Sequence, residues 1–310
     1  MSRIHDALRR AERSGQTASE PVLDILADAL PATNDAPQTS FPSVEAEVAL
    51  TGSSPEAAVT TNPDPALAKF REQEWTPNRS QVLFVQGDSS RSAEQEQFRT
   101  LRSRLLQIRA QQPLKTLLVT SALPGEGKTF VAANLAVVLA RQHGRRVLLV
   151  DGDLRRPRLH ELLGAPATPG LADYLAASAD ESAVIQSGPL QNLYFMPSGT
   201  TTSNPSELIG TGAMARLISH TKPLFDWVIV DSPPVIPVSD ATQMAEACDG
   251  VLLVLRAGST AYDIAQRAKD EFRRTPVVGV VLNRTGKDHG DGVYYYELYG
   301  NETVANGRKG

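Results

Sequence analysis

Six short runs of apolar, largely β-branched residues, separated by segments of helix length, constrain the fold of this chain more than any other feature. They are TLLVTS at 116–121, RVLLVD at 146–151, LYFMPS at 193–198, WVIVDS at 227–232, GVLLVL at 250–255 and VVGVVLN at 277–283. Each run is apolar at successive positions, as a strand covered by helices on both faces must be. The alternation with helices predicts the α/β class, with a doubly wound and mostly parallel sheet.

The stretch SALPGEGKTF follows the first of these runs and has the composition of a phosphate-binding loop. Gly125 and Gly127 let the backbone turn its N–H groups toward an anion. Lys128 supplies a positive charge to the outer phosphates, and Thr129 offers a hydroxyl group to Mg²⁺. Ala122 replaces the usual first glycine, but the strand, loop and helix context is the expected one. We predict a P-loop NTPase fold that binds ATP and Mg²⁺, with nucleotide contacts from Gly125, Glu126, Gly127, Lys128, Thr129 and Phe130.

Three carboxylates stand where strands of the predicted sheet end. Asp151 and Asp153 follow the second run, and Asp231 lies at the end of the fourth. The carboxyl ends of parallel strands face one crevice, so these side chains are expected to converge there. Like charges this close repel one another unless a cation lies among them. We predict that a phosphate-bound Mg²⁺ is held by Thr129, Asp151, Asp153 and Asp231.

The chain outside these runs divides by composition. Residues 15–80 hold ten acidic residues, three basic residues and eight prolines without sustained periodicity, which predicts a disordered acidic linker. Residues 1–14 have the pattern of a basic amphipathic helix, either solvated or a docking element. Residues 81–288 are expected to form the P-loop domain, and residues 289–310 a flexible tail.

Charge and cysteine content exclude some classes of function. The formal net charge of −4 argues, weakly, against nucleic-acid binding. The single cysteine, Cys248, excludes an intrachain disulfide framework and suits a reducing compartment. No run approaches 18 consecutive apolar residues, so we expect a cytoplasmic protein whose membrane association needs a partner.

The segment VYYYELY near the C-terminus holds four of the chain's seven tyrosines, at positions 294, 295, 296 and 299. A last strand that docks on the core is one interpretation. Three consecutive tyrosines would place side chains on both faces of such a strand, and the flanking residues are polar and turn-like. Exposed tyrosines at a polar end therefore need another explanation.

Three motifs give the chain a resemblance to a known family. They are PGEGKT at 124–129, LLVDGDLR at 148–155 and VIVDSPP at 228–234. From about residue 82 to residue 286, the chain resembles the bacterial tyrosine kinases of polysaccharide export, specifically the separate cytoplasmic CapB/CpsD type. The MinD/ParA branch of the same fold is the nearest rival. Leu123 and Pro124 before the loop, and Leu154 and Arg155 after Asp153, favour the kinase.

The resemblance implies an ATP-dependent protein-tyrosine autokinase that regulates capsule or exopolysaccharide polymerisation and export. The alternative is a MinD/ParA-type ATPase switch for positioning or partitioning. Asp153 would be the base, with Asp151 orienting it, although the two roles can be exchanged. Asn283 would either contact the adenine or cap the last strand. Catalysis would use Lys128, Asp151, Asp153 and Asp231, and the phosphate acceptors would be Tyr294, Tyr295, Tyr296 and Tyr299.

The resemblance also implies partners and a location. These are a ring-like homo-oligomer, a separate transmembrane polysaccharide co-polymerase that activates the kinase, and a cognate phosphatase, but no nucleic acid. The partner would recruit the chain to the inner face of the plasma membrane. Glu96, Arg99 and Arg102 match the family's E-x-x-R-x-x-R oligomerisation motif. A solvated charged seam is the alternative, and the helix turns a separate apolar face to the core with Phe98, Leu101, Leu105 and Ile108.

Overall fold

The computed structural model describes residues 67–84, 92–142 and 144–285, and these residues form an eight-stranded sheet. The strand order is β1-β4-β5-β3-β6-β2-β7-β8, and every pair is parallel except β4 with β5. The predicted strands are confirmed as β2 (Thr116–Ser121), β3 (Val147–Asp151), β5 (Leu193–Met196), β6 (Trp227–Asp231), β7 (Gly250–Arg256) and β8 (Val277–Asn283). Two short strands that we did not predict, β1 (Arg71–Glu72) and β4 (Gln186–Ser187), extend one edge.

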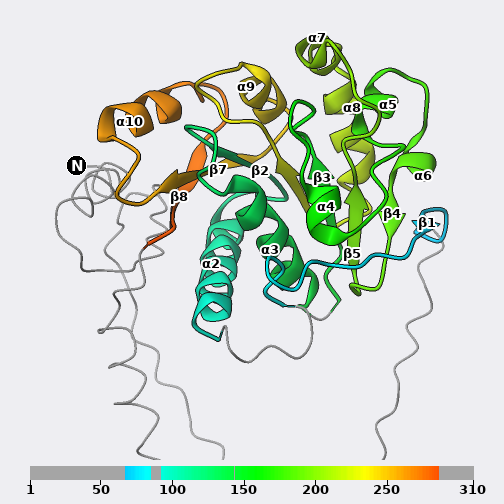
Figure 1. Ribbon diagram of the computed structural model, residues 1–310, viewed down its shortest axis with the longest axis horizontal. Helices are drawn as coiled ribbons and strands as arrows, with labels where there is room; N and C mark the ends of the chain where they lie inside the picture. Colours follow the sequence, from blue (N-terminus) through cyan, green and yellow to red (C-terminus); the bar gives the residue numbers. More distant parts are fainter. Residues whose placement is uncertain (1–66, 85–91, 143, 286–310) are drawn as a thin grey trace, which may run out of the picture.

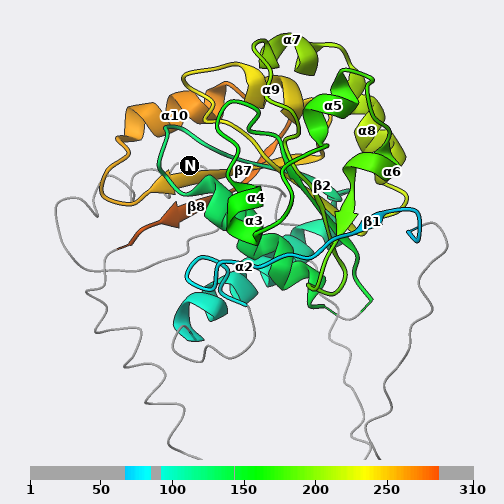
Figure 2. The same ribbon diagram turned by 45° about the vertical axis from the view of Figure 1, so that its right-hand side comes forward.

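Helices cover both faces of the sheet (Figures 1 and 2). One face packs against α2 (Ser92–Gln111), α3 (Lys128–Ala140) and α4 (Leu159–Leu163). The other packs against α5 (Leu171–Leu175), α6 (Glu181–Val184), α7 (Pro205–Gly210), α8 (Ala213–Thr221), α9 (Asp240–Ala245) and α10 (Tyr262–Asp270). The doubly wound fold is therefore as predicted.

The alternation of side chains along each strand divides the core into two layers. In β2, Leu118 belongs to the layer under α7 to α10, whereas Leu117 and Val119 belong to the layer under α2 and α3. All three are fully buried, because a central strand of a doubly wound sheet has no solvent face. The sheet is thus a rigid base, and the loops after its strands carry the polar groups.

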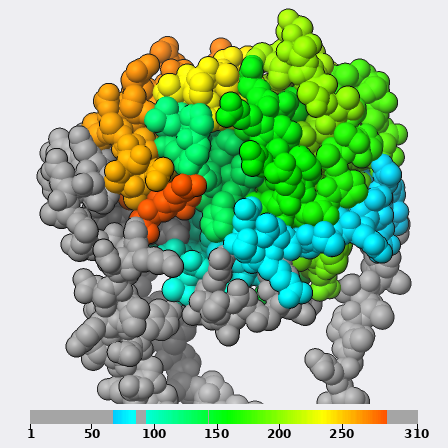
Figure 3. All heavy atoms as spheres, viewed as in Figure 1, coloured from blue at the N-terminus to red at the C-terminus, as the bar shows by residue number. Residues whose placement is uncertain are grey.

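Residues 67–80 belong to the folded domain, so the predicted linker boundary at residue 80 is wrong. Leu67, Phe70 and Trp75 are buried, and the indole nitrogen of Trp75 donates a hydrogen bond of 3.2 Å to Gln186 Oε1. The Phe70 ring stacks on Phe225 with a centroid distance of 5.9 Å. Figure 1 shows this segment, in blue, running from β1 across the molecule, and Figure 3 shows it on the surface. These apolar residues are too widely spaced to give a periodic pattern, yet each fills one place in the core.

The other predictions for the ends of the chain concern residues 1–66 and 286–310, which lie outside the described residues. The tyrosine tail is among them. Within the described ranges, no helix has both the length and the apolar character needed to cross a lipid bilayer.

Candidate functional site

The P-loop joins β2 to α3 and keeps its shape through two glycines with positive φ. Gly125 has φ +83° and Gly127 has φ +96°, a conformation that strains other residues. A Cβ atom on Gly127 would also overlap the side-chain amide of Asn283, whereas one on Gly125 would meet nothing within 4 Å. Gly127 is the N-cap of α3, so the free N–H groups of the helix begin at the loop. The predicted anion-binding geometry is therefore present.

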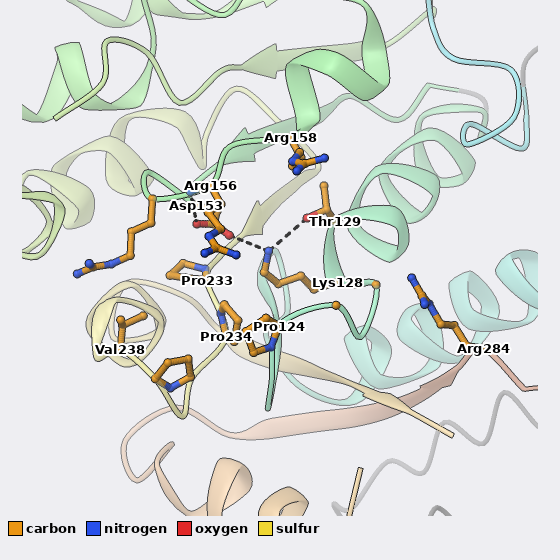
Figure 4. A pocket seen from close by; sticks show the side chains of 14 residues that line it. Pro124, Lys128, Thr129, Asp153, Arg156, Arg158, Pro233, Pro234, Val238 and Arg284 are labelled. Carbon is orange, nitrogen blue, oxygen red and sulfur yellow. Dashed lines mark hydrogen bonds and ion pairs between the residues drawn. The ribbon is translucent and has the colours of Figure 1, made fainter. Parts of the chain in front are cut away.

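Lys128 and Thr129 each contact one of the predicted carboxylates. The Lys128 ammonium lies 2.8 Å from Asp153 Oδ2, and the Thr129 hydroxyl donates a hydrogen bond of 2.7 Å to Asp231 Oδ2 (Figure 4 shows the lysine and threonine). Burial by itself lowers the pKa of Lys128, but the charges of Asp231 and Asp153 outweigh burial and raise that pKa. Lys128 is therefore held positively charged at the mouth of the P-loop.

Asp151 and Asp231 end neighbouring strands and face each other in register. Both are fully buried, and one carboxylate oxygen of each, Oδ1, has no hydrogen-bond partner. Burial, reinforced by the charge of Asp231, raises the pKa of Asp151 to about 8. Burial also raises the pKa of Asp231 to about 6, although Lys128 and Thr129 favour its charged form. A cation beside these oxygens would relieve both costs.

The predicted magnesium ligands fit such a cation only in part. Among the described residues, no group of three or more His, Cys, Asp or Glu side chains is arranged to hold a metal ion by itself. Mg²⁺ commonly uses one or two carboxylates, waters and substrate phosphates instead of a protein cage. The Thr129 hydroxyl and the free oxygen of Asp231 suit that pattern. Asp153 is paired with Lys128 at 2.8 Å, so it could join the ion only if that pair opened. The roles of Asp151 and Asp153 as magnesium ligands stay predictions.

The side chain of Glu126 stabilises the P-loop through hydrogen bonds. This carboxylate is buried, and its Oε2 accepts a hydrogen bond of 2.8 Å from the backbone N–H of Leu123. Its Oε1 accepts a hydrogen bond from the Thr260 hydroxyl and a longer one, at 3.4 Å, from the Arg256 N–H. Glu126 therefore ties the loop to the end of β7, and only its backbone remains for the predicted nucleotide contact.

Phe130 and Asn283 have structural partners of their own. The Phe130 ring packs edge-on against Phe98 of α2 at 5.9 Å, which leaves its backbone as the part that can face a nucleotide. The Asn283 side-chain amide donates a hydrogen bond of 2.8 Å to the Glu126 carbonyl. Its Oδ1 accepts a hydrogen bond from the Arg284 N–H at 2.9 Å. Asn283 thus holds the P-loop and contacts the backbone just past β8, as the capping role requires, while its contact with the adenine stays a prediction.

Arg155, the arginine of the DGDLR motif, is fixed by a buried carboxylate. Its Nε lies 2.7 Å from Asp240 Oδ2, and its Nη2 donates to Asp240 Oδ1 at 3.2 Å and to the Ser206 hydroxyl at 2.8 Å. The Asp240 side chain is 1% exposed. The arginine therefore joins the β3–α4 loop to α7 and α9. Sequence reasoning missed Asp240, since its partner is 85 residues away.

These groups surround a pocket of about 500 Å³ (Figure 4). The pocket brings together the P-loop residues Gly125, Gly127, Lys128 and Thr129 with Asp153. Its remaining lining includes residues that we did not predict, namely Pro233, Pro234, Val238, Arg156, Arg158 and Arg284. The basic run RRPR at 155–158 was the sequence signal for two of these arginines.

The residues of the predicted oligomerisation motif lie on α2, away from the pocket lining. Glu96 and Arg99 form an exposed ion pair of 2.8 Å within the helix. Arg102 donates a hydrogen bond of 3.2 Å to the Val138 carbonyl of α3, so part of its hydrogen-bonding capacity is used within the chain. The opposite side of the helix is buried at Phe98, Leu101, Leu105 and Ile108, which confirms the predicted core face.

Comparison with known proteins agrees with this geometry. Residues 117–299 match the CobQ/CobB/MinD/ParA nucleotide binding domain. The tyrosine-protein kinase YwqD of Bacillus subtilis is 34% identical over 208 residues, which are 66% of this chain and 87% of that protein. The putative tyrosine-protein kinase CapB of Staphylococcus aureus is 32% identical over 216 residues, 69% of this chain and 94% of CapB.

A solved structure agrees as well. The chimeric protein CapA2B2 aligns with a TM-score of 0.61 and 32% identity, over 71% of this chain and 96% of that one. The P-loop, the paired strand-end aspartates and the Arg155 motif all lie within residues 117–299, the range that matches the family model. The chain belongs to the CobQ/CobB/MinD/ParA nucleotide-binding family and, within it, to the bacterial tyrosine kinases.

Proposed function

We propose that this chain is an ATP-dependent protein-tyrosine autokinase that phosphorylates its own C-terminal tyrosines between subunits. One observation carries the proposal: Lys128 and Asp153 stand 2.8 Å apart in a pocket that also contains the P-loop. A cation for the transferred phosphoryl group and a carboxylate for the acceptor's proton are thus adjacent. Phosphoryl transfer needs mainly such positioning and charge neutralisation.

The nucleotide would bind through the P-loop. The backbone N–H groups from Gly125 to Phe130 and the Lys128 ammonium would hold the β- and γ-phosphates. Thr129 and Asp231 would hold Mg²⁺ against the same phosphates, and the bound ion would neutralise charge that develops on them. The partnerless Oδ1 of Asp231 supports this assignment. Asp151, one strand away, would complete the negative environment of the ion.

Asp153 is the better candidate for the base. Asp153 lines the pocket, whereas Asp151 is fully buried and is not among the lining residues. In the proposed step, the tyrosine oxygen attacks the γ-phosphorus and ADP leaves with the bridging oxygen. The phenolic proton passes to Asp153. Phosphates that draw Lys128 toward themselves would free Asp153 for this role, because the two side chains are paired in the structure.

The acceptors would be Tyr294, Tyr295, Tyr296 and Tyr299 of a neighbouring copy. Nine residues separate Thr285 from Tyr294, a reach of roughly 30 Å when extended. Glu96, Arg99 and Arg102 would bring the copies together in a ring. Each phosphotyrosine adds about −1.5 to −2 charges, so a phosphorylated tail would weaken the ring by repulsion. A cognate phosphatase would reset the cycle.

The cellular role proposed is regulation of capsule or exopolysaccharide polymerisation and export. The relative named succinoglycan biosynthesis transport protein ExoP, from Rhizobium meliloti, supports this role. A separate transmembrane co-polymerase would activate the kinase and recruit it from the cytoplasm to the inner face of the plasma membrane. No nucleic-acid partner is proposed.

The test is phosphate mapping after incubation with Mg·ATP. The wild-type chain should gain phosphate at residues 294–299, and two variants should gain none: Lys128→Met, and the tail with all four tyrosines changed to Phe. Asp153→Asn should abolish transfer while nucleotide still binds. Steady ATP hydrolysis without any phosphotyrosine, even with the adaptor's cytoplasmic segment supplied, would instead favour a MinD/ParA-type ATPase switch.

A further inference from the structure

The pocket contains positive charge that its own carboxylates do not neutralise. Lys128 is paired with Asp153, and Arg155 is paired with Asp240. Arg156 is exposed, and among the described residues its side chain has no ion pair or hydrogen bond, while its backbone N–H donates to Asp153 Oδ1 at 3.0 Å. Arg158 approaches Glu161 at 3.7 Å, with the two side chains 70% and 60% exposed. Such a contact is worth little, so both arginines remain open to an anion.

An apolar wall also lines this pocket. Pro233, Pro234 and Val238, from the loop between β6 and α9, lie on one side of Lys128, and Arg284 lies on the other (Figure 4). Proline has no N–H donor, so the wall offers apolar surface that suits an aromatic ring. Asp153 lies between this wall and the P-loop threonine, within the same pocket. A phenol against the prolines would therefore have its hydroxyl near the proposed base.

We propose that Arg156 and Arg158 form an acceptor subsite that recognises acidic residues next to the target tyrosine. The occupant is the tail of a second copy of this chain. Residues 288–302 of the sequence contain Asp288, Asp291, Glu297 and Glu302 but no lysine or arginine. The tyrosine ring occupies the wall of prolines, and the flanking carboxylates pair with the two arginines. This inference rests on the proposed kinase function and specifies its substrate class as tyrosine in acidic sequence.

The arrangement has a chemical rationale. Arginine presents a fixed fork of donors that matches a carboxylate, and the charge is retained at any physiological pH. The tail's four tyrosines lie within six residues, so a subsite based on flanking charge accepts each of them in turn without a precise register. The triphosphate is the competing occupant for the same arginines, and the experiment must separate the two.

The experiment uses a full-length donor and a full-length recipient. The donor carries Phe at its four tail tyrosines, and the recipient carries Lys128→Met, so all phosphotyrosine arises by transfer between chains. One recipient keeps the acidic tail, and a second carries Asp291→Asn and Glu297→Gln. At limiting recipient concentration, we expect the donor to phosphorylate the acidic tail about fivefold faster than the neutral tail. This factor is what two exposed ion pairs would contribute.

Two donor variants identify the residues responsible. Arg156→Ala with Arg158→Ala should abolish the preference for the acidic tail. Arg284→Ala is the matched control, since it removes an exposed arginine from the other side of the same pocket and should keep the preference. Charge reversal gives a second check. A donor with Arg156→Glu and Arg158→Glu should prefer a recipient tail with Asp291→Lys and Glu297→Lys over the acidic tail.

Several results would overturn the subsite. Equal phosphorylation rates for the acidic and neutral tails with the unaltered donor would refute it. Loss of the preference in the Arg284→Ala control would also refute it, because any arginine near the pocket would then have the same effect. Weaker ATP binding in the Arg156 and Arg158 variant, with the tail preference intact, would assign the arginines to the triphosphate. Absence of phosphate from every recipient would refute the kinase function itself, and the subsite with it.

Discussion

Asn283 and Gly127 are predicted to be energetically coupled, because the asparagine amide occupies the space that a Cβ atom on Gly127 would need. An alanine at Gly127 would adopt φ near +96°, which costs about 1–2 kcal/mol. The same backbone cost applies to Gly125→Ala, with φ +83°. Gly127→Ala must in addition displace Asn283 and break its 2.8 Å hydrogen bond to the Glu126 carbonyl, for about 1–2 kcal/mol more.

We therefore expect losses in the free energy of unfolding of about 2–4 kcal/mol for Gly127→Ala and about 1–2 kcal/mol for Gly125→Ala. Asn283→Ala alone should cost about 1–2 kcal/mol, because it leaves the Glu126 carbonyl without its donor. In the Gly127→Ala background the same change should cost close to nothing, since the hydrogen bond is already lost.

Urea denaturation without nucleotide measures these differences as a double-mutant cycle of wild type, the Gly127→Ala and Asn283→Ala variants and the double variant, with Gly125→Ala measured beside them. Nucleotide is omitted so that altered ATP affinity does not contribute to the apparent stability. The coupling energy should be about 1–2 kcal/mol. Strictly additive effects, or a Gly125→Ala variant as unstable as Gly127→Ala, would refute the reasoning that Asn283 packs against the loop.

Three further predictions concern side chains that hold the folded domain together. Trp75→Ala should lower the free energy of unfolding, measured in urea, by about 3–5 kcal/mol. No change in stability would indicate that residues 67–80 belong to the linker and not to the folded domain. Arg155→Lys should lower the free energy of unfolding by about 2 kcal/mol, because a lysine cannot bind both carboxylate oxygens of buried Asp240 at once. A variant as stable as wild type in urea would contradict this reasoning. Burial would raise the pKa of Asp249, but hydrogen bonds from Lys222 and backbone N–H groups outweigh it and lower that pKa. Wild type should therefore exceed Asp249→Asn in stability above about pH 5 and lose this advantage as the pH falls below about 4, in urea titrations across that range; a constant difference would exclude the carboxylate as the cause.

The strands were predictable from sequence because a sheet covered on both faces requires unbroken apolar runs. β5, for example, follows from LYFMPS alone. β1 and β4 were not predictable, since each has two residues and depends on pairing with a distant partner. Trp75 gave no signal for the same reason: its burial depends on Gln186 and on the Phe195 ring, 6.1 Å away between centroids.

The sequence predicted three aspartates for the candidate site and chose Asp153 as the base, but it did not predict how differently the three would be placed. The sequence places Asp151, Asp153 and Asp231 at strand ends and so predicts them together. The three carboxylates differ in burial because they lie at different positions relative to the strand ends. Asp151 and Asp231 are still within paired strands, opposite each other and fully buried. Asp153 lies two residues beyond β3, where it lines the pocket and meets Lys128. A shift of two residues past the sheet edge therefore separates the carboxylate that lines the pocket, Asp153, from the two that are fully buried at the ends of their strands.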